Sequence, residues 1–553
     1  MGSGTDTSAS SAPREKRIEL LDTTLRDGVQ GEGINFSLQD KFTVIQALDE
    51  LGVPWIEAGS PGSNPKDVEL FRAAQGISLK NAALCSFGST RRPDTAPEKD
   101  PQLQSLLDAE TGALTIFGKS WDFHVHQVLR VNLEENLAMI SQTIEWLKTR
   151  GRIVFFDAEH FFDGWKENSG YALATIRAAR AAGADRVVLC DTNGGTFPAD
   201  IAAAVAAARQ VLNEDASSNT GREPLLGIHA HNDTGLAIAN TLAAIQEGCR
   251  HVQGTLVGFG ERCGNTSLAA LIPSLELKLG YTCLPAGKLP HISEITRRVA
   301  ETANVPIPAA MPYVGSSAFS HKGGMHSDGI LKTAKSFEHI DPAAVGNDRH
   351  LLMSEVGGRS VIAERAKKIE PSITREHPAV SALTEKLKAL EAGGWAFEGA
   401  GASFELLVRR ELGRYKPLFR ILAYRVMSEH PTGESIACSQ AWAKVWVDGQ
   451  DEIAAAEGEG PVNALDGALR RALVRFYPDL DQVRLTDYKV RVIDGMAATA
   501  AKVRVLIEST DGPNVWTTVG VSADIIDASR SALVDSIEYK LIGDIERKFK
   551  AYP

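Results

Sequence analysis

Residues 153–190 read IVFFDAEHFFDGWKENSGYALATIRAARAAGADRVVLC, and this stretch contains the repeating unit that decides the fold. Two short β-rich runs, Ile153–Ala158 and Arg186–Cys190, lie on either side of an amphipathic segment, Tyr171–Ala182. Parallel strands need a long crossover connection, which is usually a helix. The stretch therefore predicts a strand, a helix and a second strand parallel to the first.

The same unit recurs over the first half of the chain. The runs that we expect to be strands are Ile18–Asp22, Trp55–Gly59, Ala82–Phe87, Ala113–Gly118, Ile153–Ala158, Arg186–Cys190, Leu225–Ala230 and His251–Leu256. Helical periodicity is clearest in Leu38–Leu51, Leu133–Thr149, Tyr171–Ala182, Ile201–Leu212 and Gly235–Glu247. Eight strand–helix units in about 260 residues favour a (β/α)8 TIM barrel. A doubly wound open sheet is the alternative, although the Gly-rich phosphate loop that usually follows its first strand is absent.

The sequence divides into four predicted parts. Residues 1–17 are expected to be a disordered N-terminal arm, and residues 18–285 to form the α/β barrel. Beyond Tyr281 the strand–helix alternation stops, so residues 286–422 predict a mostly helical linker. Its stretch Tyr313–Gly329 is crowded with Gly, Ser and His and is expected to be a loop. Residues 423–553 predict an α+β domain.

The last of these parts contains an internal duplication of strands followed by a helix. The first copy runs through Ala441–Asp448 into the helix Val462–Phe476, and the second through Lys502–Glu508 and Trp516–Val521 into the helix Ala523–Ile542. A pseudo-symmetric module of this kind could hold a small ligand between its halves. A role in dimerisation alone agrees equally well with the pattern.

Composition and charge exclude several classes of protein. The chain has 553 residues, and 59 Lys+Arg against 70 Asp+Glu give a net charge of −11, which removes the basic surface that nucleic acid or an anionic membrane requires. No stretch approaches the ~18 consecutive apolar residues of a membrane helix. The six Cys contain no C-x-x-C pair, and the N-terminus lacks the apolar core of a signal peptide. These features predict a cytoplasmic protein.

Polar side chains that could bind a metal follow the first, seventh and eighth predicted strands. Arg26 and Asp27 end the first strand, at the barrel face where active sites lie, although an exposed loop ion pair is the alternative. His229 and His231 are two residues apart on a strand, so both imidazoles point to one face. The glycines around Asn265 allow a tight loop that returns to the same mouth. Carboxylate, imidazole and amide ligands suit Mn²⁺, Mg²⁺ or Zn²⁺ and leave positions open for substrate.

Two further strand ends carry polar groups. Glu159 closes the fifth strand, and Thr192 follows the sixth. Helix capping is the alternative explanation for such residues. A metal, a cationic Arg26, a carboxylate and a hydroxyl suit the attack of an enolate on the keto group of a 2-oxo acid. The residues by themselves therefore indicate metal-assisted carbon–carbon bond chemistry.

At these positions the sequence resembles the 2-isopropylmalate, homocitrate and citramalate synthase family. The motifs that carry the resemblance are LDTTLRDGVQ (21–30), HAHND (229–233), GFGERCGN (258–265) and AFSHKGGMHSDG (318–329). Stretches that look most like the citramalate synthase branch are PGSNPKD (61–67), FGKSWD (117–122), DAEHFFDG (157–164), CDTNGGT (190–196) and ASFELLVRRELGRYKP (402–417). The resemblance extends from Arg17 to the C-terminus.

The resemblance implies roles for individual residues. The implied ligands of a divalent metal (Mn²⁺ or Mg²⁺, with Zn²⁺ and Co²⁺ as alternatives) are Asp27, His229, His231 and Asn265. The implied substrate-binding residues are Arg26, Gln30, Glu159 and Thr192, and the implied catalytic residues are Arg26, Glu159 and His326. The implied substrates are pyruvate and acetyl-CoA, which would condense to citramalate and CoA in isoleucine biosynthesis.

The resemblance also implies regulation and assembly. Isoleucine or leucine would be the effector, bound near Gly460, Pro461, Gly520 and Ser522, which precede the two helices of the duplicated module. The family further implies a homodimer. Neither nucleic acid nor a membrane is an expected partner.

Two departures from the family pattern keep other activities open. Phe337 stands where relatives often have Tyr, so a hydroxyl role is not carried over to it. Ser60 stands where the citramalate branch often has Trp, and a smaller residue would either admit a bulkier 2-oxo acid or only repack a loop. The alternatives are therefore 2-isopropylmalate synthase, with 2-oxoisovalerate as substrate, or homocitrate synthase. A retro-aldol lyase of the hydroxymethylglutaryl-CoA type and a non-catalytic amino-acid sensor are less favoured.

Overall fold

The computed structural model describes residues 16–214, 224–351, 359–367, 369–429, 438–493, 501–512 and 514–551. The chain forms two compact units. The first ends at Phe319 and includes Ile340–Arg349, and the second comprises Ser320–His339 and the chain from His350 onward. Residues 1–15 of the predicted arm lie outside the described residues, whereas Arg17 forms a parallel bridge with Thr282.

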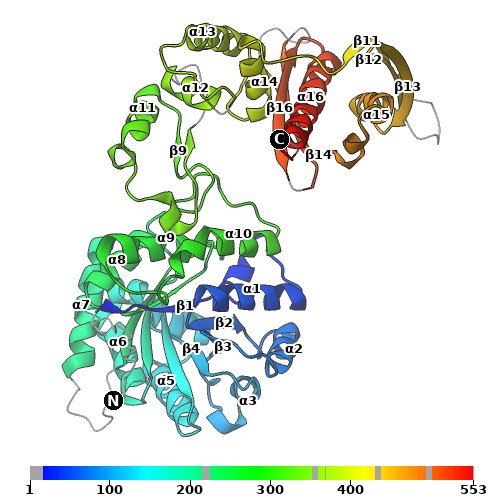
Figure 1. Cartoon of the computed structure of the whole chain (residues 1–553). Coiled ribbons are helices and arrows are strands. Elements are labelled where there is room, and N and C mark those ends of the chain that lie inside the picture. The colour runs from blue at the N-terminus through cyan, green and yellow to red at the C-terminus, as the bar shows by residue number, and fades with distance from the viewer. Residues whose placement is uncertain are drawn as a thin grey trace, which may run out of the picture. The chain divides into compact units, whose positions relative to one another are not determined.

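The first unit contains a closed barrel of eight parallel strands in sequence order, which confirms the predicted TIM barrel (Figure 1). The strands are β1 (Glu19–Asp22), β2 (Trp55–Gly59), β3 (Ala83–Ser89), β4 (Ala113–Lys119), β5 (Ile153–Glu159), β6 (Arg186–Asp191), β7 (Leu225–Ala230) and β8 (His251–Gly254). The barrel closes where β8 pairs with β1, beginning with His251 opposite Glu19. All eight strand ends that carry loops toward the site therefore meet at one rim.

Helices surround the barrel and bury the outer faces of its strands. They are α1 (Leu38–Leu51), α2 (Pro65–Ala74), α3 (Pro101–Asp108), α4 (Asp122–His124), α5 (Leu133–Lys148), α6 (Phe161–Ala181), α7 (Pro198–Glu214), α8 (Ala237–Gln246), α9 (Leu268–Pro273) and α10 (Ile292–Thr302). Ser37 and Asp40 form a capping box at the start of α1. Helix α6 begins ten residues before the predicted Tyr171 and has non-helical dihedral angles at Asn168.

An ion-paired layer fills the barrel interior near the amino ends of the strands. Arg186 donates two hydrogen bonds to Glu19, at 2.7 and 2.9 Å, and His251 Nδ1 lies 2.9 Å from the same carboxylate. Burial raises the pKa of Glu19, but His251 and Arg186 together hold it well below its usual range. Phe155 packs against His251, with ring centroids 5.1 Å apart. The interior at this end is thus filled by side chains.

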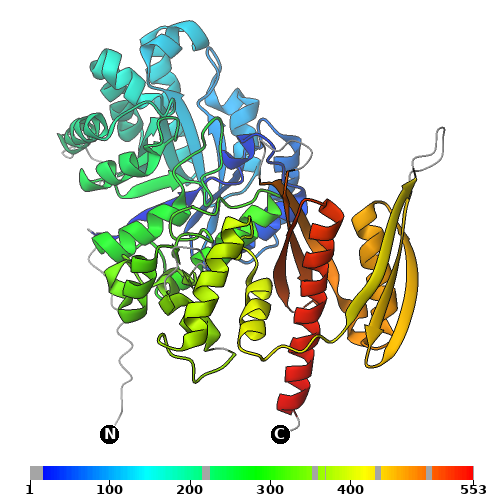
Figure 2. The ribbon, with the colours of Figure 1, turned by 90° about the horizontal axis from the view of Figure 1, so that it is seen from above.

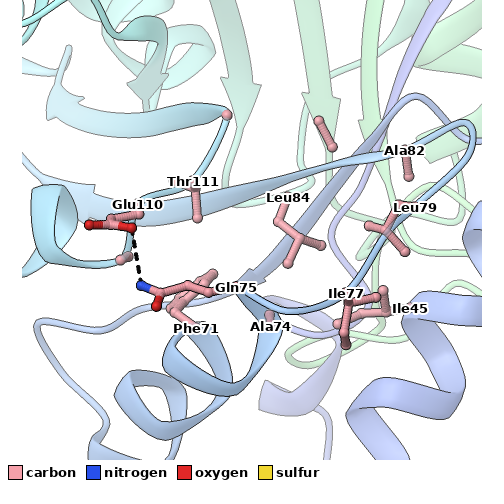
Figure 3. Close-up of a pocket in the computed structure, with 13 residues that line it drawn as sticks. Ile45, Phe71, Ala74, Gln75, Ile77, Leu79, Ala82, Leu84, Glu110 and Thr111 are labelled. Carbon is pink, nitrogen blue, oxygen red and sulfur yellow. Dashed lines mark hydrogen bonds between the residues drawn. The ribbon is translucent and has the colours of Figure 1, made fainter.

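A small hollow of about 260 Å³ lies outside the barrel, at the amino ends of β3 and β4 (Figure 3). Its wall is mostly aliphatic, with Ile77, Leu79 and Leu84 among the lining residues. Gln75 donates a hydrogen bond of 3.3 Å to Glu110 at one side. Glu110 is the one charged residue among those that line the hollow. The hollow therefore has few groups that could take part in a polar reaction.

The second unit begins with a short two-stranded sheet and a group of helices. Strands β9 (Ser320–His321) and β10 (His350–Leu351) are parallel, and α11 (Gly324–Lys332) follows β9. A loop was expected here, and that expectation was wrong for α11 because its Gly, Ser and His residues conceal the helical periodicity. Helices α12 (Arg359–Ala366), α13 (Pro378–Ala392) and α14 (Gly401–Glu411) come next, within the part of the chain that was predicted to be mostly helical.

The rest of the second unit is the duplicated module. Each half has three antiparallel strands with one helix against them (Figure 2). The halves are β11 (Arg420–Glu429), β12 (Cys438–Val447), β13 (Gln450–Gly458) and α15 (Pro461–Val474), then β14 (Arg484–Val492), β15 (Val503–Thr510), β16 (Val515–Ser522) and α16 (Ile525–Ala551). Strand β13, QDEIAAAEG, was missed because its alanine and acidic residues do not favour a strand. Its nine residues nevertheless pair in register with β12.

None of the helices within the described residues is both long enough and apolar enough to cross a membrane.

Burial changes the titration of one carboxyl in the second unit. Glu538 lies in α16 and is 1% exposed. The Leu418 backbone N–H donates a hydrogen bond of 3.1 Å to its Oε1. Burial raises the pKa of Glu538 to about 7, although this hydrogen bond and nearby Arg410 oppose the shift.

We expect Glu538→Gln to stabilise the chain at high pH only. The carboxyl has a pKa of about 4.3 in the unfolded chain. Between about pH 4.3 and pH 7, Glu538 is therefore protonated in the folded state and ionised in the unfolded state. The free energy of unfolding therefore falls as pH rises through this window, and the neutral glutamine avoids that loss. Urea unfolding should give roughly 2 kcal/mol of added stability at about pH 8 and little near pH 4.5. The exposed Glu459→Gln is the control, and an equal effect of Glu538→Gln at both pH values would contradict the assignment.

Candidate active site

Three buried ligand-type side chains converge at the carboxyl end of the barrel. One ligating atom from each of Asp27, His229 and His231 lies within 4.8 Å of the others. His229 Nε2 lies 3.3 Å from Asp27 Oδ2 and 3.3 Å from His231 Nε2. The strand ends bring together residues that are about 200 positions apart in the sequence, as the motif positions predicted.

Asn265 reaches the same place through a glycine-dependent loop. Gly264 has φ +84°, and a Cβ there would lie 2.0 Å from the Gly258 carbonyl oxygen, so a larger residue would break the turn. The loop returns beside β7, where Asn265 forms an antiparallel bridge with His231. Asn265 Nδ2 donates to the Phe259 carbonyl at 3.0 Å. This contact leaves the amide oxygen as the group available to a ligand.

The residues present fit a divalent cation. Asp27 Oδ1 and Asn265 Oδ1 are buried and have no hydrogen-bond partner among the described residues. Such orphaned acceptors are costly unless another group, such as a cation, satisfies them. The set of one carboxylate, two imidazoles and one amide oxygen suits Mn²⁺, Mg²⁺ or Zn²⁺.

The electrostatics keep Asp27 and His231 in their metal-binding protonation states. Burial raises the pKa of Asp27, but Arg26 and the two imidazoles hold it well below its usual range, so the carboxylate is ionised. Burial and the neighbouring His229 lower the pKa of His231 to about 4, so His231 is neutral. Ionised carboxylate and neutral imidazole are the forms that coordinate metals.

Arg26 is held rigidly beside this cluster. Its Nε donates to Glu57 Oε2 at 2.6 Å, and its Nη1 lies 3.3 Å from Asp27 Oδ2. The guanidinium lies 3.8 Å from the centroid of the Phe87 ring. Burial lowers the pKa of Arg26, but Glu57 and Asp27 raise it above its usual value, so the side chain is a permanent cation. A fixed cation next to a cavity can stabilise negative charge that develops on a reacting oxygen.

Thr192, which follows β6, is held by residues that follow β5 and β8. His160 has a left-handed backbone conformation, with φ +55°, and its N–H donates to Thr192 Oγ1 at 2.9 Å. The hydroxyl proton of Thr192 is therefore directed to another acceptor. Arg262 donates to the Thr192 carbonyl at 2.7 Å and forms two hydrogen bonds with Asp233, at 2.7 and 3.0 Å. Arg262 thereby links the loop that carries Asn265 to the loops after β6 and β7.

A cavity of about 620 Å³ joins these groups. Its lining residues are Arg26, Asp27, Val29, Gln30, Ser60, Ser63, Asn64, Asp67, Phe87, Ser89, Gln102, Phe117, Asp157, Glu159, Cys190, Thr192, His229, His231, Glu261 and Arg262. Glu159 forms an ion pair with Lys119 at its edge. Ser60, one of the departures from the family pattern, lies in the wall with its hydroxyl 3.0 Å from that of Ser63.

Two buried acids that support the site were not predicted from the sequence. Glu57 in β2 pairs with Arg26, and Asp157 in β5 lines the cavity. Both sit in strands that are otherwise mostly apolar, WIEAG and IVFFDAE. An acidic residue inside such a strand is costly unless it has a partner, and that signal could have identified both.

The predicted catalytic residue His326 belongs to the second unit. His326 is exposed in α11, and its ring stacks on Phe337 with centroids 4.2 Å apart. Phe337, which stands where the resemblance implies a tyrosine, therefore contacts this histidine but has no hydroxyl to offer.

The predicted effector residues have unequal surroundings. Gly460 is the N-cap of α15 and has no side chain to cap it, and Pro461 is the first residue of that helix. Gly520 packs on α16, where a Cβ would lie 2.0 Å from the Ala528 carbonyl oxygen. Ser522 accepts a hydrogen bond from the Asp524 N–H, and Asp524 accepts from Ile526 N–H at the start of α16. The start of α16 thus already has a carboxylate, whereas the start of α15 has none.

Comparison with known proteins agrees with this architecture. The HMGL-like family matches residues 17–297, the homocitrate synthase post-HMGL domain-like family residues 313–394, and the LeuA allosteric (dimerisation) domain residues 398–541. A curated (R)-citramalate synthase of Synechocystis sp. is 49% identical over 96% of this chain and 97% of its own length. That of Aquifex aeolicus is 49% identical over 96% of this chain and 99% of its own.

The chain belongs to the citramalate synthase family. A probable 2-isopropylmalate synthase of Methanopyrus kandleri is also similar over 94% of this chain and 98% of its own, but at 30% identity. The citramalate synthases are therefore the nearer relatives of the two. The expected family, and the branch within it, are confirmed.

Asp27→Ala should abolish metal binding while the barrel survives. The substitution removes the one anionic ligand, so calorimetry with Mn²⁺ should show affinity at least about 100-fold weaker than in the parent. Asp185→Ala is a matched control, because it removes a carboxylate that pairs with Lys148 at the opposite end of the barrel. The control should lower stability and keep the Mn²⁺ affinity. Parent-like binding by Asp27→Ala would remove Asp27 from the metal site.

Proposed function

We propose that this chain is an (R)-citramalate synthase, which condenses acetyl-CoA with pyruvate and releases citramalate and CoA. The observation that carries the proposal is the buried cluster of Asp27, His229 and His231 beside a rigid Arg26. The cluster lies in a chain that is 42–49% identical to five curated (R)-citramalate synthases over nearly its whole length. We also propose a cytoplasmic location, in keeping with six free cysteines.

The net reaction makes one bond and breaks another. The methyl carbon of acetyl-CoA loses a proton and attacks the keto carbon of pyruvate, whose oxygen gains a proton. Water then cleaves the thioester and frees CoA. This hydrolysis makes the overall reaction irreversible. Asp27, His229, His231 and Asn265 would hold a divalent cation, which when bound would supply Lewis acidity to the keto group.

The residues around the cavity bind and orient the 2-oxo acid. Thr192 has a hydroxyl proton to donate, which suits the carboxylate of pyruvate. Arg26 stabilises negative charge on the enolate and alkoxide oxygens, and Glu57 holds it in place before the reaction begins. Gln30 and Glu159 line the same cavity and complete the polar contacts with substrate.

His326 is the proposed acid–base residue for the acetyl methyl proton. An imidazole can both accept and donate a proton, as this task requires. His326→Gln should lower kcat by about 100-fold or more, because general acid–base catalysis contributes 10²–10⁴. The Mn²⁺ affinity measured by calorimetry should not change. His350→Gln, an exposed histidine of the same unit, is the control, and an unchanged kcat in His326→Gln would transfer the role to another residue.

The experiment that tests the function is release of free thiol from acetyl-CoA with a panel of 2-oxo acids. We expect turnover with pyruvate to exceed that with 2-oxobutyrate, 2-oxoisovalerate and 2-oxoglutarate, and to require Mn²⁺ or Mg²⁺ that a chelator can remove. Preference for 2-oxoisovalerate would instead indicate 2-isopropylmalate synthase, with Ser60 as the first residue to exchange. Preference for 2-oxoglutarate would indicate homocitrate synthase.

Regulation and assembly are part of the same proposal. The match of residues 398–541 to the LeuA allosteric (dimerisation) domain supports a regulated oligomer. We propose that it is a homodimer that isoleucine, or leucine, inhibits. The effector carboxylate is placed best at Gly460 and Pro461, because the start of α16 already has the carboxylate of Asp524. The contribution of Gly520 and Ser522 would then be to the shape of the binding site.

A further inference from the structure

A chain of hydrogen bonds crosses the barrel interior and ends on a predicted metal ligand. Gln253 Nε2 donates to Asp157 Oδ1 at 2.8 Å, and Gln253 Oε1 lies 2.9 Å from His229 Nδ1. Gln253 is 1% exposed, and Asp157 and His229 are each 4% exposed. Water therefore does not replace these contacts.

Strand register explains why these side chains meet. Residue His229 of β7 pairs directly with Gln253 of β8, so their side chains lie next to each other on the inner face. Asp157 belongs to β5, which is not a neighbour of β8 in the barrel. Gln253 thus connects His229 on the neighbouring strand β7 with Asp157 on β5, across the barrel interior.

The chemistry of an amide gives this link a direction. Asp157 Oδ1 accepts from the Gln253 NH₂ group, so the amide carbonyl faces His229. A carbonyl oxygen only accepts, which means that the proton of neutral His229 is on Nδ1. The lone pair is then on Nε2, the atom that lies 3.3 Å from Asp27 Oδ2 and from His231 Nε2.

We propose that Gln253 is a positioning residue for the metal: it holds His229 in the tautomer and orientation that present Nε2 to the cation. Asp157 acts one step further back by orienting the Gln253 amide. Groups that bind the second nitrogen of a ligating histidine commonly fix its tautomer. This inference rests on the metal site of the proposed function.

Gln253→Leu tests the role by replacing the amide with a side chain of similar size that cannot accept a hydrogen bond. Titration of the full chain with Mn²⁺ in a calorimeter should show affinity weakened by about 10- to 100-fold, the usual cost of losing such a partner. An affinity within about twofold of the parent would overturn the proposal.

A double variant tests the direction of the link. Asp157→Asn with Gln253→Glu exchanges donor and acceptor: the new amide donates to the new carboxylate, which still accepts from His229 Nδ1. We expect Mn²⁺ affinity within about threefold of the parent, while Gln253→Leu stays weak. Affinity as weak as that of Gln253→Leu would overturn the proposal, because an acceptor for His229 would then not be enough.

A control separates positioning from general loss of stability. His251→Gln lies two residues earlier in β8 and disrupts the ion-paired layer with Glu19 at the other end of the barrel. It should lower the unfolding temperature and leave the Mn²⁺ affinity unchanged. An equal loss of affinity in His251→Gln and Gln253→Leu would overturn the proposal as a structural effect. Failure of the parent itself to bind Mn²⁺ would be a failure of the proposed function instead.

Discussion

The buried carboxylate of Asp27 is the constraint on which the rest of the site depends. An isolated charge in a protein interior is very costly, so it must have partners that are equally buried. Arg26, its neighbour in the chain, and two imidazoles from the end of β7 surround it. The closed barrel brings these strand ends to one rim, and the ion-paired layer of Glu19, Arg186 and His251 fills the opposite end.

A second set of groups determines how the first set is oriented. Glu57 holds Arg26, Gln253 holds His229, and the His160 N–H holds Thr192. Each contact is 2.6–2.9 Å long and lies in a buried or partly buried place, so little rearrangement is needed when charge develops. The reacting residues are therefore positioned before substrate arrives. Such preorganised groups stabilise a transition state without a reorganisation cost during the reaction.

The two halves of the duplicated module share a fold but differ at the starts of their helices. Both halves have the same order of three strands and one helix, but their helix starts differ, since Asp524 caps α16 and no side chain caps α15. The two halves therefore do not offer equivalent carboxylate sites. Symmetry in the sequence predicts the shared fold of the halves, and their chemistry depends on individual capping residues.

The sequence by itself determined the barrel, its strands to within a few residues, and the positions of Arg26, Asp27, His229 and His231 at strand ends. These features depend on periodicity and on motif spacing, which are local along the chain. The tertiary structure alone decided the partners: Gln253 meets Asp157 across 96 positions, and Glu57 meets Arg26 across 31. Such pairs depend on strand register and barrel closure, and the hydrophobic pattern of each strand carries no information about which side chain lies opposite it.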